Sequence, residues 1–120
     1  MTKKFTMIQL FSILDGRLST EIGDVYEMLN HITGDSLMTH HLPVAMDYLK
    51  EVNPKWFQEL KAELEGIKKL CGNDFQTCMN VIKESYNTEH EIPQLSNEEK
   101  SGFGKYMVDN SLLLKKLKTA

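Results

Sequence analysis

The sequence predicts an all-α fold, a compact single-domain bundle of short helices, on three observations. Apolar residues recur every three or four positions along most of the chain, which is the period of an amphipathic helix. The segments with this period are short, and isolated helices below about 12–15 residues are marginal in water, so they must pack on one another. The length of 120 residues suits one domain.

Two helices are expected in the N-terminal third of the chain. Thr6 can cap the first helix, which continues to Leu14 as a short, strongly apolar segment. A clean stripe of apolar residues over positions 22–32 predicts the second helix, and Ser19 or Thr20 can cap it.

The middle of the chain begins with a predicted loop over residues 35–42. Pro43 then opens a helix at a position where a missing N–H costs nothing. Asn53-Pro54 supplies an N-cap and a proline start for the longest helix, and Asn73 or Asp74 starts the helix after it.

The C-terminal third departs from the helical pattern once. Residues 87–95 are expected to form an extended connector, or at most one edge strand. Ser96 and Glu99 have the spacing of a capping box, which predicts a short helix. Gly102-Phe103-Gly104-Lys105 is expected to break that helix as a flexible joint, after which residues 106–118 can again be helical.

The net charge of -3 is the sum of two unlike parts. Residues 1–99 carry 9 basic and 16 acidic side chains, a charge of -7, and the remaining residues carry +4. We therefore divide the chain into a helical domain over 1–111 and a basic C-terminal helix end or tail over 112–120. An acidic body repels phosphate, so direct DNA binding is disfavoured. The leucines near the C-terminus could form a dimer seam or fold back on the core, which leaves a homo-oligomer open.

Several functional classes are disfavoured by the residues at hand. No apolar run approaches the roughly 20 residues of a transmembrane helix, so we expect no membrane partner. Cys71 and Cys78 are expected to pack as buried thiols, with a disulfide or a metal pair as the alternatives. No zinc-ligand spacing, nucleophile motif or carboxylate pair can be identified. We therefore expect no cofactor, no metal and no catalytic residue, in a protein that is not an enzyme.

One pattern near the N-terminus resembles a family of small proteins of tailed bacteriophages. It consists of Asp15-Gly16-Arg17-Leu18, Val25-Tyr26, Leu29, Ile32-Thr33-Gly34-Asp35, Thr39-His40 and Leu42-Pro43. The resemblance is best over residues 5–50, and the chain departs from the pattern at His41 and Val44. It implies a viral accessory protein in the host cytoplasm and implies no reaction. By analogy, such a protein binds and disables a host defence or a host enzyme.

The first functional hypothesis is therefore a stoichiometric inhibitor of a host protein, such as a component of antiviral defence. An acidic helical body suits docking onto a basic surface, because complementary charge speeds the encounter. The acidic residues of the second helix, Glu21, Asp24 and Glu27, are the candidate contact face.

The alternative hypothesis is a sponge for a small nucleotide signal. Arg17, Thr39, His40 and His41 would line that site, with the helix start at Pro43 facing the phosphate. A purely structural interpretation competes with it, in which one histidine satisfies a backbone group near the helix start and the other is solvated.

Overall fold

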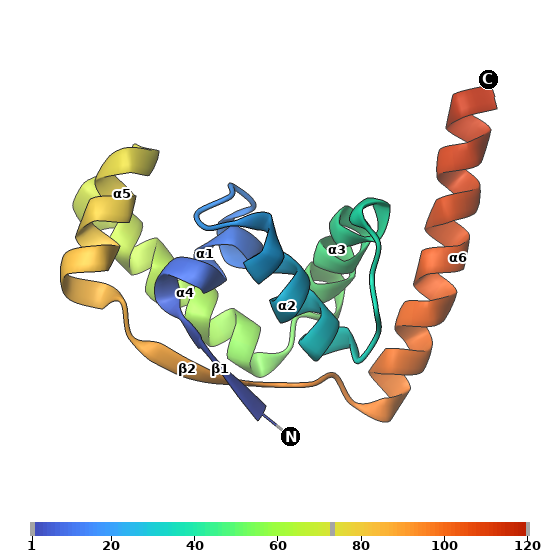
Figure 1. Ribbon diagram of the computed structural model, residues 1–120, viewed down its shortest axis with the longest axis horizontal. Coiled ribbons are helices and arrows are strands. Elements are labelled where there is room, and N and C mark those ends of the chain that lie inside the picture. The colour runs from blue at the N-terminus through green and yellow to red at the C-terminus, as the bar shows by residue number, and fades with distance from the viewer. Residues whose placement is uncertain (1, 73, 120) are drawn as a thin grey trace.

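The structure is a computed structural model that describes residues 2–72 and 74–119, with side chains for residues 2–72 and 74–110. Helices dominate it (Figure 1), so the predicted all-α class is confirmed with the addition of one small sheet. In chain order the elements are β1 (Thr2–Thr6), α1 (Met7–Asp15), α2 (Ile22–Thr33), the 3₁₀ turn η1 (Thr39–His41), α3 (Leu42–Val52), α4 (Lys55–Cys71), α5 (Phe75–Val81), the π-helical turn η2 (Ile82–Tyr86), β2 (Glu89–Pro93) and α6 (Asn97–Thr119).

The sheet joins the start of the chain to its last third. β1 and β2 pair antiparallel, with Phe5 opposite His90 and Lys3 opposite Ile92. The extended segment predicted over residues 87–95 is confirmed as β2. The sequence does not predict its partner, because β1 lacks alternating apolar residues and buries only Phe5.

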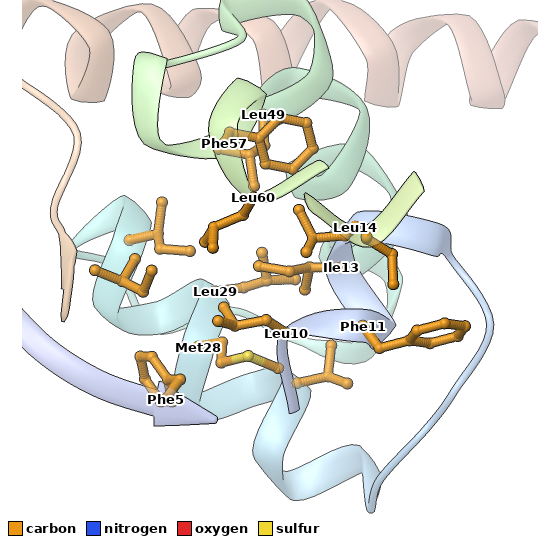
Figure 2. Close-up of a cluster of buried hydrophobic side chains, with 14 of the residues drawn as sticks. Phe5, Leu10, Phe11, Ile13, Leu14, Met28, Leu29, Leu49, Phe57 and Leu60 are labelled. Carbon is orange, nitrogen blue, oxygen red and sulfur yellow. The ribbon is translucent and has the colours of Figure 1, made fainter. Parts of the chain in front are cut away.

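The core is built around α1, whose side chains are buried on nearly every side. A helix that is apolar all round belongs inside a domain, and this one follows a capping box in which Thr6 N donates to Gln9 Oε1 at 2.9 Å. The predicted start at Thr6 is therefore confirmed. Figure 2 shows Leu10 and Ile13 of α1 beside Leu29 of α2, in a cluster that also includes Leu60 of α4.

Helix α6 attaches to the body through its first half, which packs against α3 (Figure 1). The Tyr48 hydroxyl of α3 donates to the backbone oxygen of Glu99 at 2.7 Å. The Tyr48 ring lies 5.3 Å from the Phe103 ring and 5.1 Å from the Tyr106 ring, measured between centroids. The anchor of α6 is therefore aromatic, and Phe103 at its centre is fully buried.

The predicted break at Gly102-Phe103-Gly104-Lys105 is wrong, because α6 runs through it without interruption. The predicted capping box before it is confirmed, since Ser96 N donates to Glu99 Oε1 at 2.9 Å and Glu99 N to Ser96 Oγ at 3.1 Å. The division between residues 1–111 and 112–120 falls inside α6 and stays a prediction. The C-terminal leucine stripe lies outside the side chains that the structure describes.

Two predicted helix caps are also wrong. The N-cap of α2 is Glu21 rather than Ser19 or Thr20, because the Ser19 hydroxyl bonds Ile8 O and Ser12 Oγ while that of Thr20 donates to Asp24. The predicted N-cap Asn53 instead ends α3 in the left-handed conformation, with φ of 50°.

The remaining predicted boundaries are close to the observed ones. The predicted loop over residues 35–42 contains η1, and α3 begins at Leu42, one residue before Pro43. Asp74 caps α5 by accepting the Thr77 backbone N–H at 2.9 Å, as predicted. Over the described part of the chain, no helix combines the length and the apolar character that a membrane crossing requires.

We expect the Gly66→Ala variant to be more stable than the wild-type protein by about 0.5–1 kcal/mol. Gly66 is exposed in the middle of α4, and no atom lies within 4 Å of the place its Cβ would take. Alanine therefore gains helix propensity without a clash. Urea denaturation followed by circular dichroism measures the difference, and an unfolding free energy below that of the wild type would contradict the expectation.

Candidate functional site

An apolar pocket of about 180 Å³ opens between the α1–α2 connection, α2 and α3. None of its lining residues is charged. They are Ser12, Gly16, Leu18, Ile22, Val25, Leu42 and Met46. Two of them stand at the surface, because Leu18 is 53% and Ile22 is 51% exposed. Ile22 thus differs from the other members of the predicted apolar stripe, which face the core.

The α1–α2 connection holds the rim of this pocket in place. Gly16 ends α1 with φ of 97°, which turns the chain back over the helix. The Ser12 hydroxyl then accepts the Ser19 N–H at 2.9 Å, and the two hydroxyls lie 2.8 Å apart. Leu18 lies inside this hydrogen-bonded turn, which positions its exposed side chain at the edge of the pocket. In the sequence, the only sign of an exposed Leu18 is that an apolar residue stands within a predicted turn.

None of the predicted acidic residues of this region lines the pocket. Glu21 is exposed and directly precedes Ile22, which does line it. Asp24 is half-buried and accepts a hydrogen bond from Thr20. Glu27 pairs with Lys3 of β1 at 2.6 Å. Of these three residues, only Glu21 is both exposed and without an ion pair among the described residues, and it is next to a pocket residue in the chain.

Arg17 forms part of an ionic cluster on the side of α1 that faces α4 and α5. Its Nε donates to Asp15 Oδ2 at 2.6 Å, and Lys68 of α4 binds the other oxygen of that carboxylate. The guanidinium carbon lies 5.6 Å from the Phe11 ring centroid and 5.4 Å from that of Phe75. Burial alone would raise the pKa of Asp15, but the bonds and charges of Arg17 and Lys68 outweigh it and lower the pKa to about 2.

Thr39, His40 and His41 are brought together in η1, before α3. The Thr39 hydroxyl hydrogen-bonds that of Tyr26, and His41 Nδ1 accepts the Met38 N–H at 3.0 Å. The exposed His40 ring contacts the His41 ring, with the centroids 4.1 Å apart and the ring planes tilted by 53°. This bonding favours the structural interpretation of His41. The Arg17 side chain instead packs against Phe11 of α1 and Phe75 of α5.

A second pocket of about 220 Å³ lies between α4 and β2, and the sequence does not predict it. Its lining combines aromatic, apolar and acidic residues. They are Trp56, Glu59, Leu60, Glu63, His90, Glu91 and Ile92. Residues 59 and 63 are one helical turn apart, which the sequence shows. Their proximity to residue 91 arises only because β2 packs against α4. Among the residues with described side chains, no group of three His, Cys, Asp or Glu could hold a metal ion.

The two cysteines are free thiols near the α4–α5 turn. Cys78 is buried, as predicted, and Cys71 is half-buried. Burial raises the pKa of the Cys78 thiol to about 11, and the neighbouring Cys71 adds to this effect. A thiol with such a pKa is protonated at neutral pH and is a poor nucleophile.

One family model matches the segment of the chain that forms the pocket between α2 and α3. The family model "Domain of unknown function (DUF7736)" matches residues 5–63, just under half of the chain. Every residue that lines this pocket falls in the matched segment. No curated protein and no solved structure matches the chain.

Proposed function

We propose that the protein is a small phage accessory protein that binds a host protein in the host cytoplasm and inhibits it stoichiometrically. A component of antiviral defence is the target class that we propose. The observation that carries the proposal is the apolar pocket with half-exposed Leu18 and Ile22, together with the exposed Glu21 that directly precedes Ile22 in the chain. The sequence resemblance to tailed-bacteriophage proteins supports the viral setting.

This arrangement has the anatomy of a protein-binding surface. Interfaces concentrate apolar contacts at their centre and place polar or charged groups at the rim. Buried apolar anchors carry most of the binding energy, whereas rim charges mainly set the association rate and exclude wrong partners. Leu18 and Ile22 supply the apolar centre, and the exposed Glu21, with Asp24 on the same helix, contributes negative charge that favours a basic partner.

The geometry favours protein binding over the nucleotide sponge. The pocket between α2 and α3 is lined by no charged side chain that could pair with a phosphate. The proposed phosphate ligands are also engaged in the fold, since Arg17 pairs with Asp15 and His41 accepts the Met38 N–H. We therefore place the site at the pocket and not at η1.

We expect the double variant Glu21→Lys, Asp24→Lys to bind its host partner about tenfold more weakly than the wild-type protein, mainly through slower association. Immobilised full-length protein is incubated with lysate of the bacterial host, and the retained partner is purified and titrated by calorimetry. The loss should shrink as salt is added, because rim charges are screened.

The matched control is Glu59→Lys, Glu63→Lys, which makes the same charge change on α4. It should leave binding to the partner unchanged. The proposal fails if no partner binds saturably with a fixed stoichiometry, if both double variants lose binding equally, or if the bound partner keeps its full activity.

A further inference from the structure

We infer that the pocket between α2 and α3 receives one aliphatic side chain from an amphipathic helix of the partner, with Lys or Arg on the flank that faces α2. This inference rests on the proposed function and specifies the partner's chemistry.

The size of the pocket selects a single side chain. A dry cavity of roughly 150 Å³ lined by aliphatic residues accommodates one benzene, and this pocket measures about 180 Å³. Five of its seven lining residues are aliphatic or methionine, and none is charged. A leucine, isoleucine or methionine side chain of the partner fills such a space. The half-exposed Leu18 and Ile22 then contact the next turn of the partner's helix.

The walls of the pocket favour a helix over an extended peptide. Val25 lies within α2, and Leu42 and Met46 lie one turn apart on α3, so most of the wall is helical surface. An extended segment would need backbone partners along its length, as at a sheet edge, whereas a helix satisfies its own backbone groups. The only sheet in the described chain is β1–β2, and neither of its strands lines this pocket.

The charge around the pocket is asymmetric. On the α2 side, the exposed Glu21 directly precedes the pocket residue Ile22, and no ion pair among the described residues involves Glu21. On the α3 side, the lining residues Leu42 and Met46 are uncharged. Cationic residues of a bound helix are therefore favoured on the flank that faces α2, which orients the helix in the groove.

An unbiased selection tests this inference. An mRNA-displayed library of random 16-residue peptides is selected on the immobilised full-length protein. Enriched peptides should share one Leu, Ile or Met with at least two Lys or Arg within a helical turn of it. By fluorescence anisotropy, such a peptide should bind Ile22→Ser at least tenfold more weakly than the wild type.

Two surface variants and one assembly measurement complete the design. Leu70→Ser and Val108→Ser remove exposed side chains elsewhere, at 68% and 60% exposure, and should bind the selected peptide as the wild type does. Circular dichroism should show all three variants folded, since each changes a residue that is at least half exposed. Light scattering should give the same mass for Ile22→Ser and the wild type.

Four outcomes would overturn the inference. They are enrichment of no peptide, enriched peptides without the aliphatic and cationic pair, equal binding by Ile22→Ser, and a wild-type dimer that Ile22→Ser dissociates, which would make a second copy the occupant. If the inference fails while charge reversal at residues 21 and 24 still weakens capture of the host partner, the proposed function stands. If both experiments fail, both conclusions fall.

Discussion

The Gly102→Ala variant is expected to be less stable than the wild-type protein by about 1–3 kcal/mol, although alanine is the better helix former. The reason is a close approach between two helices. A Cβ at residue 102 would lie 2.6 Å from the Tyr48 hydroxyl oxygen, closer than any ordinary contact. Urea denaturation at neutral pH measures the loss in the free energy of unfolding.

The Tyr48 hydroxyl cannot easily move away from that clash. It donates to the Glu99 backbone oxygen at 2.7 Å, and its ring is buried between α3 and α6 against Phe103 and Tyr106. Relief of the contact must therefore break the hydrogen bond or shift α6 away from α3. Because this contact is the anchor of α6, the variant should also lose part of its helical signal.

Two variants separate the clash from a general effect of alanine. Gly104→Ala lies in the same helix, has no atom within 4 Å of its Cβ, and should stabilise the protein by about 0.5–1 kcal/mol. In the background of Tyr48→Phe, Gly102→Ala should no longer destabilise, since the nearest remaining atom of the ring is 3.7 Å away. A loss that persists in the Tyr48→Phe background would refute the clash as the cause.

The second large effect is expected for Asp15→Asn, which should lower the free energy of unfolding by about 2 kcal/mol at pH 7. The Asp15 side chain is only 6% exposed and holds Arg17 and Lys68 at the junction of α1 and α4. Its neutral replacement removes the charge that pairs with both cations and leaves the mostly buried Lys68 with a weaker partner. Thermal and urea denaturation both report this loss.

The loss should depend on pH in a defined direction. The folded-state pKa of Asp15 is about 2, below the value of 3.8 for an unperturbed aspartate. The stabilisation is therefore complete above pH 3.8 and is lost as the pH falls towards 2. The stability difference between wild type and Asp15→Asn should shrink over that interval.

Glu65→Gln provides the control for Asp15→Asn, because Glu65 contacts the same Lys68 from an exposed position at 3.7 Å. A surface pair of this kind contributes less than about 1 kcal/mol. The expected order is thus a large loss for Asp15→Asn and a small one for Glu65→Gln. Equal losses, or a pH-independent loss for Asp15→Asn, would show that the buried carboxylate contributes no more to the free energy of unfolding than a surface ion pair does.

Much of the fold could be read from local signals. Thr6, Asp74 and the Ser96–Glu99 pair cap helices where the sequence predicts them, because each cap is made within three or four residues. Asn53 shows the limit of such signals, since asparagine suits both an N-cap and a left-handed helix end. Asn53 therefore belongs to the end of α3 and Pro54 to the start of α4, whereas the sequence predicts that both begin the later helix.

The candidate site was only partly predictable. Glu21 and Asp24 were identified by charge, and Glu21 directly precedes Ile22, which lines a pocket that no sequence motif indicates. Leu18 and Ile22 resemble ordinary core residues in a sequence. Whether such a residue faces the core or the surface depends on how α2 is set against α3, which is a property of packing.

The sequence by itself determined the helical class, most helix boundaries and the split between an acidic body and a basic end, because these follow from periodicity, capping and composition. Only the tertiary structure decided that β1 pairs with β2, that α6 continues through its two glycines, and that an apolar pocket opens between α2 and α3. Each of these depends on residues far apart in the chain. Gly102 illustrates the reason. The Tyr48 hydroxyl, 54 positions earlier in the chain, leaves no room for a Cβ at residue 102, and no local sequence pattern predicts this contact.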